Sequence, residues 1–252
     1  MARVVSVGRQ DFEKLREKNN FYIDKTRFLV DWWRADDEVT LITRPRRFGK
    51  TLNMSMAEKF FSITNAGKGC LFEGLKVWKD EDFRKLQGSY PVISLSFANV
   101  KEREYPAAVE RICQILAGLY QEHRFLLDSP GLSEEEKKIF RSVCVHMPEV
   151  TASMSLHWLS KFLYSHYGKK VIIFLDEYDT PMQEAYVNGY WQEMVSLIRS
   201  MFNAAFKTNP YLERAIMTGV TRISRESVLS DLNNLEVVTT TSEKYADSFG
   251  LI

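Results

Sequence analysis

The stretch Leu41–Met56, LITRPRRFGKTLNMSM, decides the fold because an apolar strand pattern runs directly into Gly-Lys-Thr and then into a helical pattern. A helix that begins right after a strand points its first backbone N–H groups and its positive dipole end at the edge of the sheet. In such a phosphate-binding loop Gly49 lets the backbone approach the phosphates, and Lys50 reaches the β- and γ-phosphate oxygens. The Thr51 hydroxyl is then a Mg²⁺ ligand.

The loop departs from the P-loop pattern G-x-x-x-x-G-K-[ST], because Arg44 occupies the position of the first glycine. Pro45 has a fixed φ angle, so we expect proline to shape the turn in place of glycine. The arginines of the loop add positive charge beside a bound anion. We expect the nucleotide to be bound by Arg44, Pro45, Arg46, Arg47, Phe48, Gly49, Lys50, Thr51 and Leu52.

A second apolar strand, within VIIFLDEYDTP from Val171 to Pro181, ends in the adjacent carboxylates of Asp176 and Glu177. In a parallel sheet this ending lies at the carboxyl edge, where ligands of open α/β folds bind. We expect Asp176 to hold Mg²⁺, and Glu177 to act as the general base for the water that attacks the γ-phosphate. Strand ends also carry polar residues simply because they reach solvent. The phosphate loop upstream favours the catalytic interpretation.

A third strand ends at Thr218, which we expect to lie beside Glu177 and to orient the attacking water. Arg222 and Arg225 follow shortly afterwards. An arginine that reaches the γ-phosphate, from the same chain or from a neighbouring subunit, stabilises the charge of the transition state. We therefore add Thr218 and Arg222 to Glu177 and Lys50 as candidate catalytic residues.

Five short apolar segments alternate with helical patterns, which indicates an α/β fold with a mainly parallel five-stranded sheet and helices on both faces. The expected strands are Val39–Thr43, Val92–Phe97, Val171–Leu175, Arg214–Thr218 and Glu236–Thr241. The clearest helical patterns are Ala108–Leu127, Ser155–Tyr167 before Gly168, and the apolar face from Trp191 to Ala205. The pair Ser133 and Glu136 predicts a capping box at the start of another helix. Thr180, Pro181 and Gln183 predict a helix start with an N-cap, an N1 proline and a capping-box partner, so we expect structural roles for Asp179 and Thr180. No repeat or linker marks a boundary, so we expect one domain over residues 1–252, with residues 1–36 as a helical lead-in.

Composition excludes several classes of protein. The 252 residues are 45% hydrophobic and 27% charged, which excludes a disordered chain. The formal net charge of +1 gives no general attraction to nucleic acid or to an anionic membrane. Cys70, Cys113 and Cys144 are widely spaced, so we expect free thiols in a reducing compartment. Apolar runs fall short of the roughly 18 residues of a membrane span, and we expect a soluble, cytoplasmic protein.

The chain resembles the bacterial AAA-ATPase-like family over nearly its whole length. The shared motifs, in order, are FYIDKT (Phe21–Thr26), LITRPRRFGKTLN (Leu41–Asn53), YPVISLSF (Tyr90–Phe97), IIFLDEYDTP (Ile172–Pro181), TGVTRIS (Thr218–Ser224) and LNNL (Leu232–Leu235). The resemblance implies a P-loop sheet of the additional-strand (ASCE) type, with the strand ending at Thr218 between the phosphate-loop strand and the acidic strand. It also implies that arginine is ordinary at position 44.

Carried over residue by residue, the resemblance implies phosphate and metal roles for Lys50 and Thr51, a metal role for Asp176, a base role for Glu177 and a sensor role for Thr218. Asp24 and Lys25 match the amino-terminal motif of the family, without a derived role. Members commonly continue into a carboxy-terminal nuclease-like domain of the PD-(D/E)xK type. We find no Asp and Glu-x-Lys nuclease core in these residues, and we assign this chain no nuclease activity.

The sequence thus predicts Mg²⁺-dependent ATP hydrolysis that serves as a switch or motor for a downstream nuclease-like domain or a partner protein. One alternative is a regulatory module that binds nucleotide and hydrolyses it poorly, because the first glycine and a carboxy-terminal lid are missing. Another is a nucleic-acid-binding module that uses Arg44, Arg46 and Arg47, although the net charge gives it no support. No N-K-x-D motif for guanine is present, which favours adenine.

Overall fold

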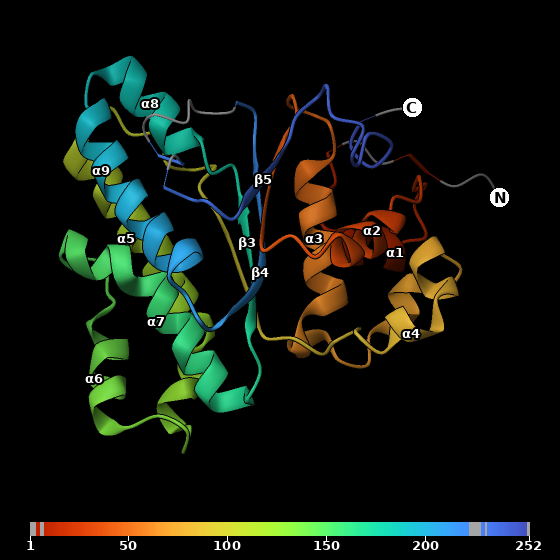
Figure 1. The fold of residues 1–252 in the computed structure, drawn as a ribbon, viewed down its shortest axis with the longest axis horizontal. Coiled ribbons are helices and arrows are strands. Elements are labelled where there is room, and N and C mark those ends of the chain that lie inside the picture. The colour runs from red at the N-terminus through yellow and green to blue at the C-terminus, as the bar shows by residue number, and fades with distance from the viewer. Residues whose placement is uncertain (1–3, 6–7, 222–227, 230, 251–252) are drawn as a thin grey trace.

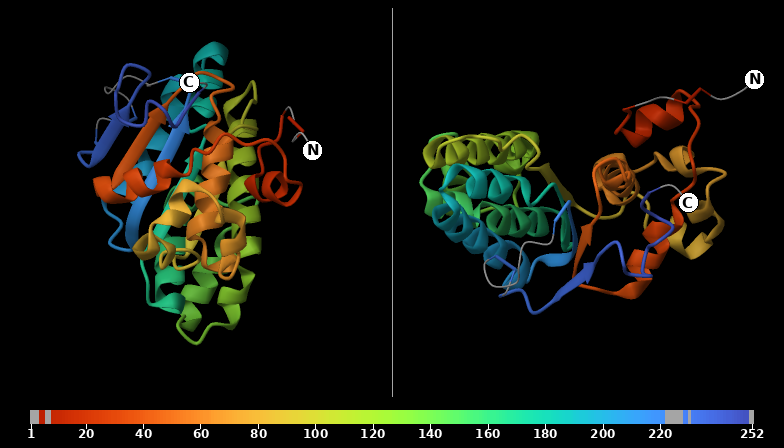
Figure 2. Two further views of the ribbon diagram at one scale, coloured as in Figure 1. Left: turned by 90° about the vertical axis from the view of Figure 1, so that its right-hand side faces the viewer. Right: turned by 90° about the horizontal axis from the view of Figure 1, so that it is seen from above.

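The computed structural model describes residues 4–5, 8–221, 228–229 and 231–250. The described chain forms three layers, with one sheet between two groups of helices (Figures 1 and 2). The strands are β1 (Val39–Thr43), β2 (Val92–Ser96), β3 (Val171–Asp176), β4 (Leu212–Gly219) and β5 (Leu235–Val238). Their order is β2-β3-β4-β1-β5, and all four pairings are parallel. The expected five-stranded α/β fold is confirmed.

Strand β4 lies between the strand that leads into the phosphate loop and the strand that ends in carboxylates. Thr218 of β4 is in register with Ile42 of β1, and Met217 is in register with Leu175 of β3. The carboxyl ends of the three strands therefore meet along one edge of the sheet, and β4 lies between the other two strands, as the resemblance implied.

The helices divide between the two faces of the sheet (Figure 1). One face carries α1 (Phe12–Glu17), α2 (Arg27–Ala35), α3 (Lys50–Phe61), α4 (Glu81–Arg84) and the 3₁₀ turns Ile63–Asn65, Gly69–Phe72 and Lys76–Lys79. The other face carries α5 (Tyr105–Glu122), α6 (Glu134–Ser142), α7 (Glu149–Tyr167), α8 (Thr180–Asn188), α9 (Trp191–Phe202), the 3₁₀ turn Arg124–Asp128 and the π-helical turn Asn203–Lys207.

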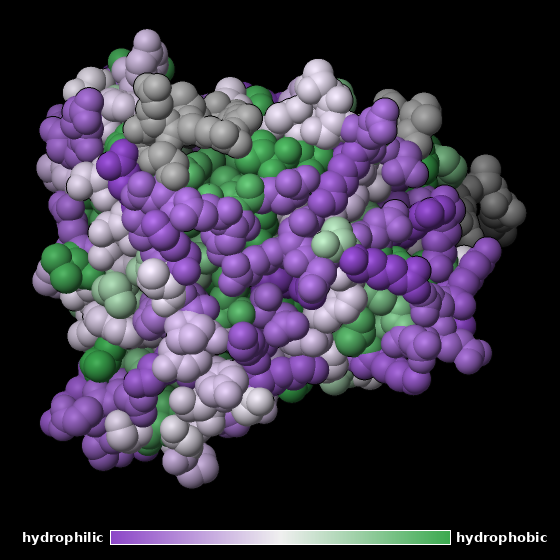
Figure 3. Space-filling view, viewed as in Figure 1, coloured by the Kyte–Doolittle hydropathy of each residue, from purple (hydrophilic) through white to green (hydrophobic). Residues whose placement is uncertain are grey.

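Each face buries its own hydrophobic core. Trp32, Phe60 and Phe61 belong to the core beneath α2 and α3, whereas Leu156 and Ile198 belong to the core beneath α7 and α9. Figure 3 shows hydrophilic side chains over both helical layers, with hydrophobic side chains visible between them toward the upper end of the sheet. The sheet that carries the candidate site is therefore packed between two buried cores.

Several expected boundaries were wrong for local reasons. Strand β5 ends at Val238 because Thr239 and Ser242 close a turn, with the Thr239 amide donating to the Ser242 hydroxyl at 2.9 Å. Helix α5 ends at Glu122, and the expected continuation is a separate 3₁₀ turn. Helix α7 begins before its apolar stripe, at Glu149 after Pro148 in an extended conformation.

The helix-end signals had mixed outcomes. The capping box of Ser133 and Glu136 and the left-handed Gly168 at the end of α7 are both confirmed. The expected capping box at Thr180 is wrong, because the N-cap of α8 is Asp179 and Gln183 donates to the side chain of that residue. Cys70, Cys113 and Cys144 are free thiols. In the described part of the chain, each helix is too short or too polar to cross a membrane.

Candidate nucleotide-binding site

The phosphate loop joins β1 to α3 at the carboxyl edge of the sheet. The Arg44 amide donates to the Gly219 carbonyl at 3.1 Å, which ties the loop entry to β4. Arg47 and Gly49 both have left-handed φ angles, 69° and 76°, and Gly49 is the N-cap of α3. The first N–H groups of α3 have no partner within the helix, so they are available to an anion at this edge.

The side chain of Lys50 crosses the inside of the loop. It is buried, and its Nζ donates to the carbonyl oxygens of Arg44 at 2.8 Å and Pro45 at 3.0 Å. Burial lowers the pKa of Lys50, and the nearby carboxylates of Asp176 and Glu177 oppose that shift. The ammonium therefore lies between the loop backbone and the acidic strand end.

Thr51 connects the phosphate loop to the acidic strand directly. Its Oγ1 donates to Oδ2 of Asp176 at 2.7 Å, although the two residues are 125 positions apart. A hydroxyl and a carboxylate oxygen at this separation lie close enough to share one metal ion. The two motifs that the sequence singled out therefore form one site.

The second oxygen of Asp176 is held by two other groups. Oδ1 accepts hydrogen bonds from the Thr218 hydroxyl and, at 3.1 Å, from the Glu177 amide. We expected Thr218 to lie beside Glu177 and to orient the attacking water. Its hydroxyl is bonded to Asp176, the residue before Glu177, because the register of β3 and β4 brings Thr218 level with the end of β3. Asp176 is buried, so these three donors set the orientation of its carboxylate.

Glu177 stands in an unusual backbone conformation. Its φ angle is 51°, in the left-handed region, and its side chain is partly exposed. Its Oε2 accepts a hydrogen bond from the Thr180 hydroxyl at 3.2 Å. Left-handed backbone at a residue other than glycine is strained, and strain of this kind concentrates at functional sites. The side chain is thus partly buried at the edge of the sheet, and its carboxylate has an orienting partner.

Arg44 does not join the other arginines of the loop. Its guanidinium is buried, donates to the carbonyl oxygens of Thr43 at 3.1 Å and Val238 at 3.2 Å, and lies 5.9 Å from the centre of the Phe249 ring. Burial lowers the pKa of Arg44. The exposed cationic part of the loop is therefore Arg46 and Arg47, and the side chain of Arg44 fastens the loop entry to β5.

Residues near the carboxyl end also contact the phosphate loop, and our sequence reasoning missed them. Asn53 of α3 donates through Nδ2 to the Ser248 carbonyl at 2.8 Å, and the Gly250 amide donates to the Phe48 carbonyl at 3.0 Å. Gly250 has a φ angle of 98°, and a Cβ there would lie 2.9 Å from the Phe48 ring, so a larger residue would be strained at this position. Most of these partners are backbone groups, which leave no side-chain signal in a sequence.

Two residues of the amino-terminal motif FYIDKT form hydrogen bonds with segments near the phosphate loop. The Asp24 carboxylate accepts from the Thr26 amide at 2.9 Å and from the Lys76 amide at 2.7 Å, which joins the start of α2 to the turn Lys76–Lys79. Lys25 donates through Nζ to the Asp247 carbonyl. Both residues thus hold the scaffold around the loop. Arg222 and Arg225 lie outside the described residues.

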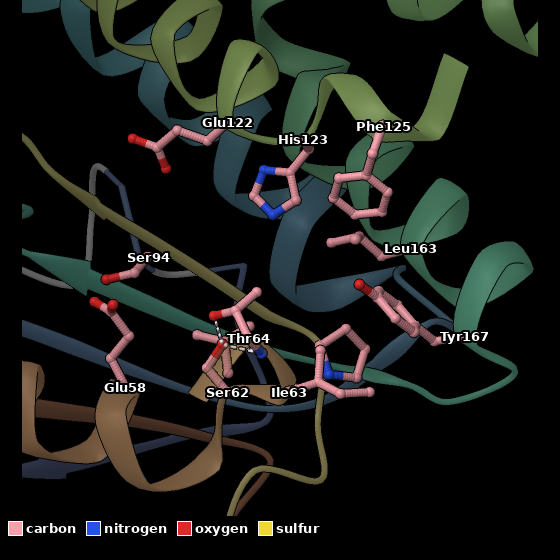
Figure 4. Close-up of a pocket in the computed structure, with 12 residues that line it drawn as sticks. Glu58, Ser62, Ile63, Thr64, Ser94, Glu122, His123, Phe125, Leu163 and Tyr167 are labelled. Atoms are coloured by element: carbon pink, nitrogen blue, oxygen red, sulfur yellow. Dashed lines mark hydrogen bonds between the residues drawn. The ribbon is translucent and has the colours of Figure 1, made fainter. Parts of the chain in front are cut away.

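A pocket of about 240 Å³ lies at the opposite edge of the sheet (Figure 4). Its wall includes Pro91 and Val92 at the start of β2, and Figure 4 shows Glu122 and His123 of the α5 end across from Glu58 of α3. The phosphate loop is at the carboxyl ends of the strands, so this pocket is separate from the candidate site.

Among the described residues, no group of three or more His, Cys, Asp or Glu side chains could hold a metal ion by itself.

Comparison with known proteins identifies a family and a relative to which the chain is similar. A family model described as "Predicted AAA-ATPase" matches residues 6–229. An uncharacterized protein in the vnfD 5' region of Azotobacter chroococcum mcd 1 is 26% identical over 238 residues, which cover 94% of this chain and 41% of that protein. The chain therefore spans about two fifths of the length of this relative. No solved structure is significantly similar. Since the family model covers most of the chain, the protein belongs to the AAA-ATPase-like family of predicted AAA-ATPases.

Proposed function

We propose that this protein binds ATP with Mg²⁺, hydrolyses it, and uses turnover as a switch or motor for a downstream domain or a partner protein. The observation that carries the proposal is the hydrogen bond of 2.7 Å between Thr51 and Asp176. Strand β4 between β1 and β3 supports a P-loop fold of the ASCE type, in which these two residues share the metal. Family membership supports nucleotide binding.

The donor set fits Mg²⁺. This ion takes one or two protein oxygens, keeps several waters and binds phosphate oxygens, so one hydroxyl and one carboxylate suffice. Thr51 and Asp176 would hold the ion, and Mg²⁺ bound there would neutralise charge on the β- and γ-phosphates. The first amides of α3, Lys50 and the exposed Arg46 and Arg47 would surround the phosphates.

Glu177 is the candidate general base. Its carboxylate follows directly on the metal-binding residue, is partly exposed, and has an orienting hydrogen bond from Thr180. In this role it accepts a proton from the attacking water. Thr218 contributes by holding the carboxylate of Asp176, and Arg222 is proposed to stabilise charge on the transferred phosphoryl group.

Replacing Glu177 with Gln tests the assignment. The base role predicts that E177Q keeps its affinity for ATP while turnover falls by roughly 10²-fold or more. Phosphate release should require Mg²⁺ and should be lost in K50A, and ATP should be preferred to GTP. Wild-type protein that binds ATP without releasing phosphate would favour the regulatory module instead.

Nucleic-acid binding through the arginine cluster has less support than nucleotide binding. The guanidinium of Arg44 is buried against β5, which leaves Arg46 and Arg47 as the exposed arginines of the loop. Two exposed cations provide little of the counterion release that drives binding to a polyanion. A salt-dependent affinity for DNA that is independent of nucleotide and of Lys50 would reverse this preference.

A further inference from the structure

Asp179 has contacts that neither the phosphate loop nor the helix that it precedes explains. The residue is the N-cap of α8 and is 1% exposed, but its side chain accepts no capping hydrogen bond from that helix. Its Oδ2 instead accepts from the Val220 amide at 3.0 Å and from the Thr221 amide at 2.8 Å. The Thr221 hydroxyl, at 2.9 Å, and the Gln183 side chain, at 2.6 Å, donate to the same oxygen.

The burial of the Asp179 carboxylate is costly, so other contacts must offset the loss of its hydration. Moving a charge out of water costs several kcal/mol unless hydrogen bonds replace its hydration. Here the replacing donors come mainly from the residues that follow β4, at Val220 and Thr221. A helix cap would need only an exposed serine or asparagine. The arrangement therefore serves to fasten two strand ends together.

The backbone between Asp176 and Asp179 is bent to allow this contact. Glu177 adopts its left-handed conformation, and the next amide, of Tyr178, donates back to the Thr218 carbonyl at 2.9 Å. The Tyr178 hydroxyl donates to the Thr221 carbonyl at 2.9 Å. A left-handed residue other than glycine costs roughly 1–2 kcal/mol, so the conformation of Glu177 needs support from its neighbours.

The two strand ends approach so closely that a side chain would not fit between them. A Cβ at Gly219 would lie 2.6 Å from Cε1 of Tyr178 and 2.7 Å from Oδ1 of Asp179. Residues 177–179, which follow β3, and residues 218–221, at the end of β4 and just beyond it, thus form one packed unit, which we name the carboxylate clamp. The clamp contains Glu177 on the β3 side and Thr218 on the β4 side, and the Thr218 hydroxyl orients Asp176.

We propose that Asp179 is a positioning residue for ATP hydrolysis: through the carboxylate clamp it holds Glu177 in its left-handed conformation and keeps Thr218 on Asp176. The proposal rests on the proposed function, because it assigns Asp179 a part in the same reaction. Asp179 does not touch the reacting atoms. Its effect is transmitted by the backbone of the clamp, in which a displacement of about 1 Å can lower a rate by roughly 10²-fold.

The test compares D179A, D179N and the matched control Q183L. In D179A we expect kcat to fall about 10- to 100-fold, while the affinity for a fluorescent ATP analogue stays within about 3-fold of wild type. The Mg²⁺ concentration for half-maximal turnover should rise, since Asp176 loses its orientation. D179N should lie between D179A and wild type, because an amide oxygen accepts the same hydrogen bonds more weakly. Q183L removes one donor of four and should retain kcat within about 2-fold.

Hydrogen exchange gives a readout that does not depend on turnover. The amides of Tyr178, Val220 and Thr221 should exchange faster in D179A, whereas amides in β1 should not change. If D179A does not fold, a D179N kcat lowered at least about 3-fold at unchanged ATP affinity supports the proposal, and an unchanged kcat overturns it.

The remaining outcomes separate this inference from the proposed function. A wild-type protein without ATP turnover overturns the proposed function and the positioning role with it. Active wild-type protein with an equally active D179A overturns the positioning role alone. An equal loss of kcat and of ATP affinity in D179A also contradicts the proposal, because it indicates general damage to the site.

Discussion

The Thr51 hydroxyl donates to Oδ2 of Asp176 across 2.7 Å, and this bond joins a helix start to a strand end from another part of the chain. Removing the hydroxyl tests its part in metal binding. We expect T51V to lose roughly 10²-fold in Mg²⁺-dependent turnover, because the variant lacks one of the two proposed protein ligands of the metal. T51S keeps the hydroxyl and should stay near wild type. Phosphate release at saturating ATP measures both, and equal turnover of T51V and T51S would contradict the metal site.

The three arginines of the loop should divide into two groups. Arg44 bonds two buried carbonyl oxygens, so R44A should lower the free energy of unfolding by about 2–3 kcal/mol. R46A and R47A should leave stability within about 0.5 kcal/mol but raise the KM for ATP, since both side chains are exposed at the loop. Urea unfolding and steady-state kinetics measure the two effects. A loss of ATP affinity in R44A without a loss of stability would contradict the division.

Lys50 should make stability depend on pH in the alkaline range. Burial lowers the pKa of Lys50 in the folded state, so the unfolded chain binds more protons between that lowered pKa and the ordinary value of 10.5. The contribution of Lys50 to the free energy of unfolding is therefore fully present above pH 10.5 and is lost as the pH falls through the pKa of the folded state. The unfolding free energy of wild type relative to K50M should therefore rise with pH across this window. A difference independent of pH would be evidence against a buried ammonium.

Two glycine-to-alanine substitutions should have opposite effects. G219A places a methyl group 2.6 Å from the Tyr178 ring, and we expect a loss of about 1–3 kcal/mol in stability. Gly118 lies inside α5 with open space at its Cβ position, so G118A should stabilise the protein by up to about 1 kcal/mol. Thermal unfolding of both variants provides the comparison. A harmless G219A would show that β3 and β4 do not end in close contact.

The thiols should react in two classes. Burial raises the pKa of the Cys113 thiol to about 11, while Cys70 and Cys144 are exposed. At pH 8 a chromogenic disulfide reagent should modify Cys70 and Cys144 quickly and Cys113 only after unfolding, because the thiolate is the reacting form. C113A should remove the slow phase. Equal rates for all three thiols would be inconsistent with the packing of α5.

Local sequence patterns predicted the central part of the fold well. The run from β1 through Gly49 to α3 is contiguous, so the order of strand, loop and helix could be predicted without a structure. The same holds for Asp176, which directly ends an apolar strand. The position of β4 between these strands came from the family resemblance and not from periodicity, since strand order is a property of tertiary packing.

The contacts that orient the site could not be predicted from local patterns. Arg44 was expected among the phosphate-binding cations, but its guanidinium finds backbone carbonyls of β1 and β5. Asp179 was expected to have a structural part at the helix start, but its partners lie after β4. In both cases the acceptors or donors are largely backbone groups, which every residue except proline carries alike.

The left-handed backbone at Glu177 bears on how variants of this protein should be selected. Glycine or asparagine tolerates that conformation better than glutamate, so substitution there is expected to stabilise the fold. A library screened for heat resistance alone would therefore enrich replacements at position 177 and discard the proposed base. Screens for robust variants should keep this codon constant, or apply a growth requirement that depends on nucleotide turnover.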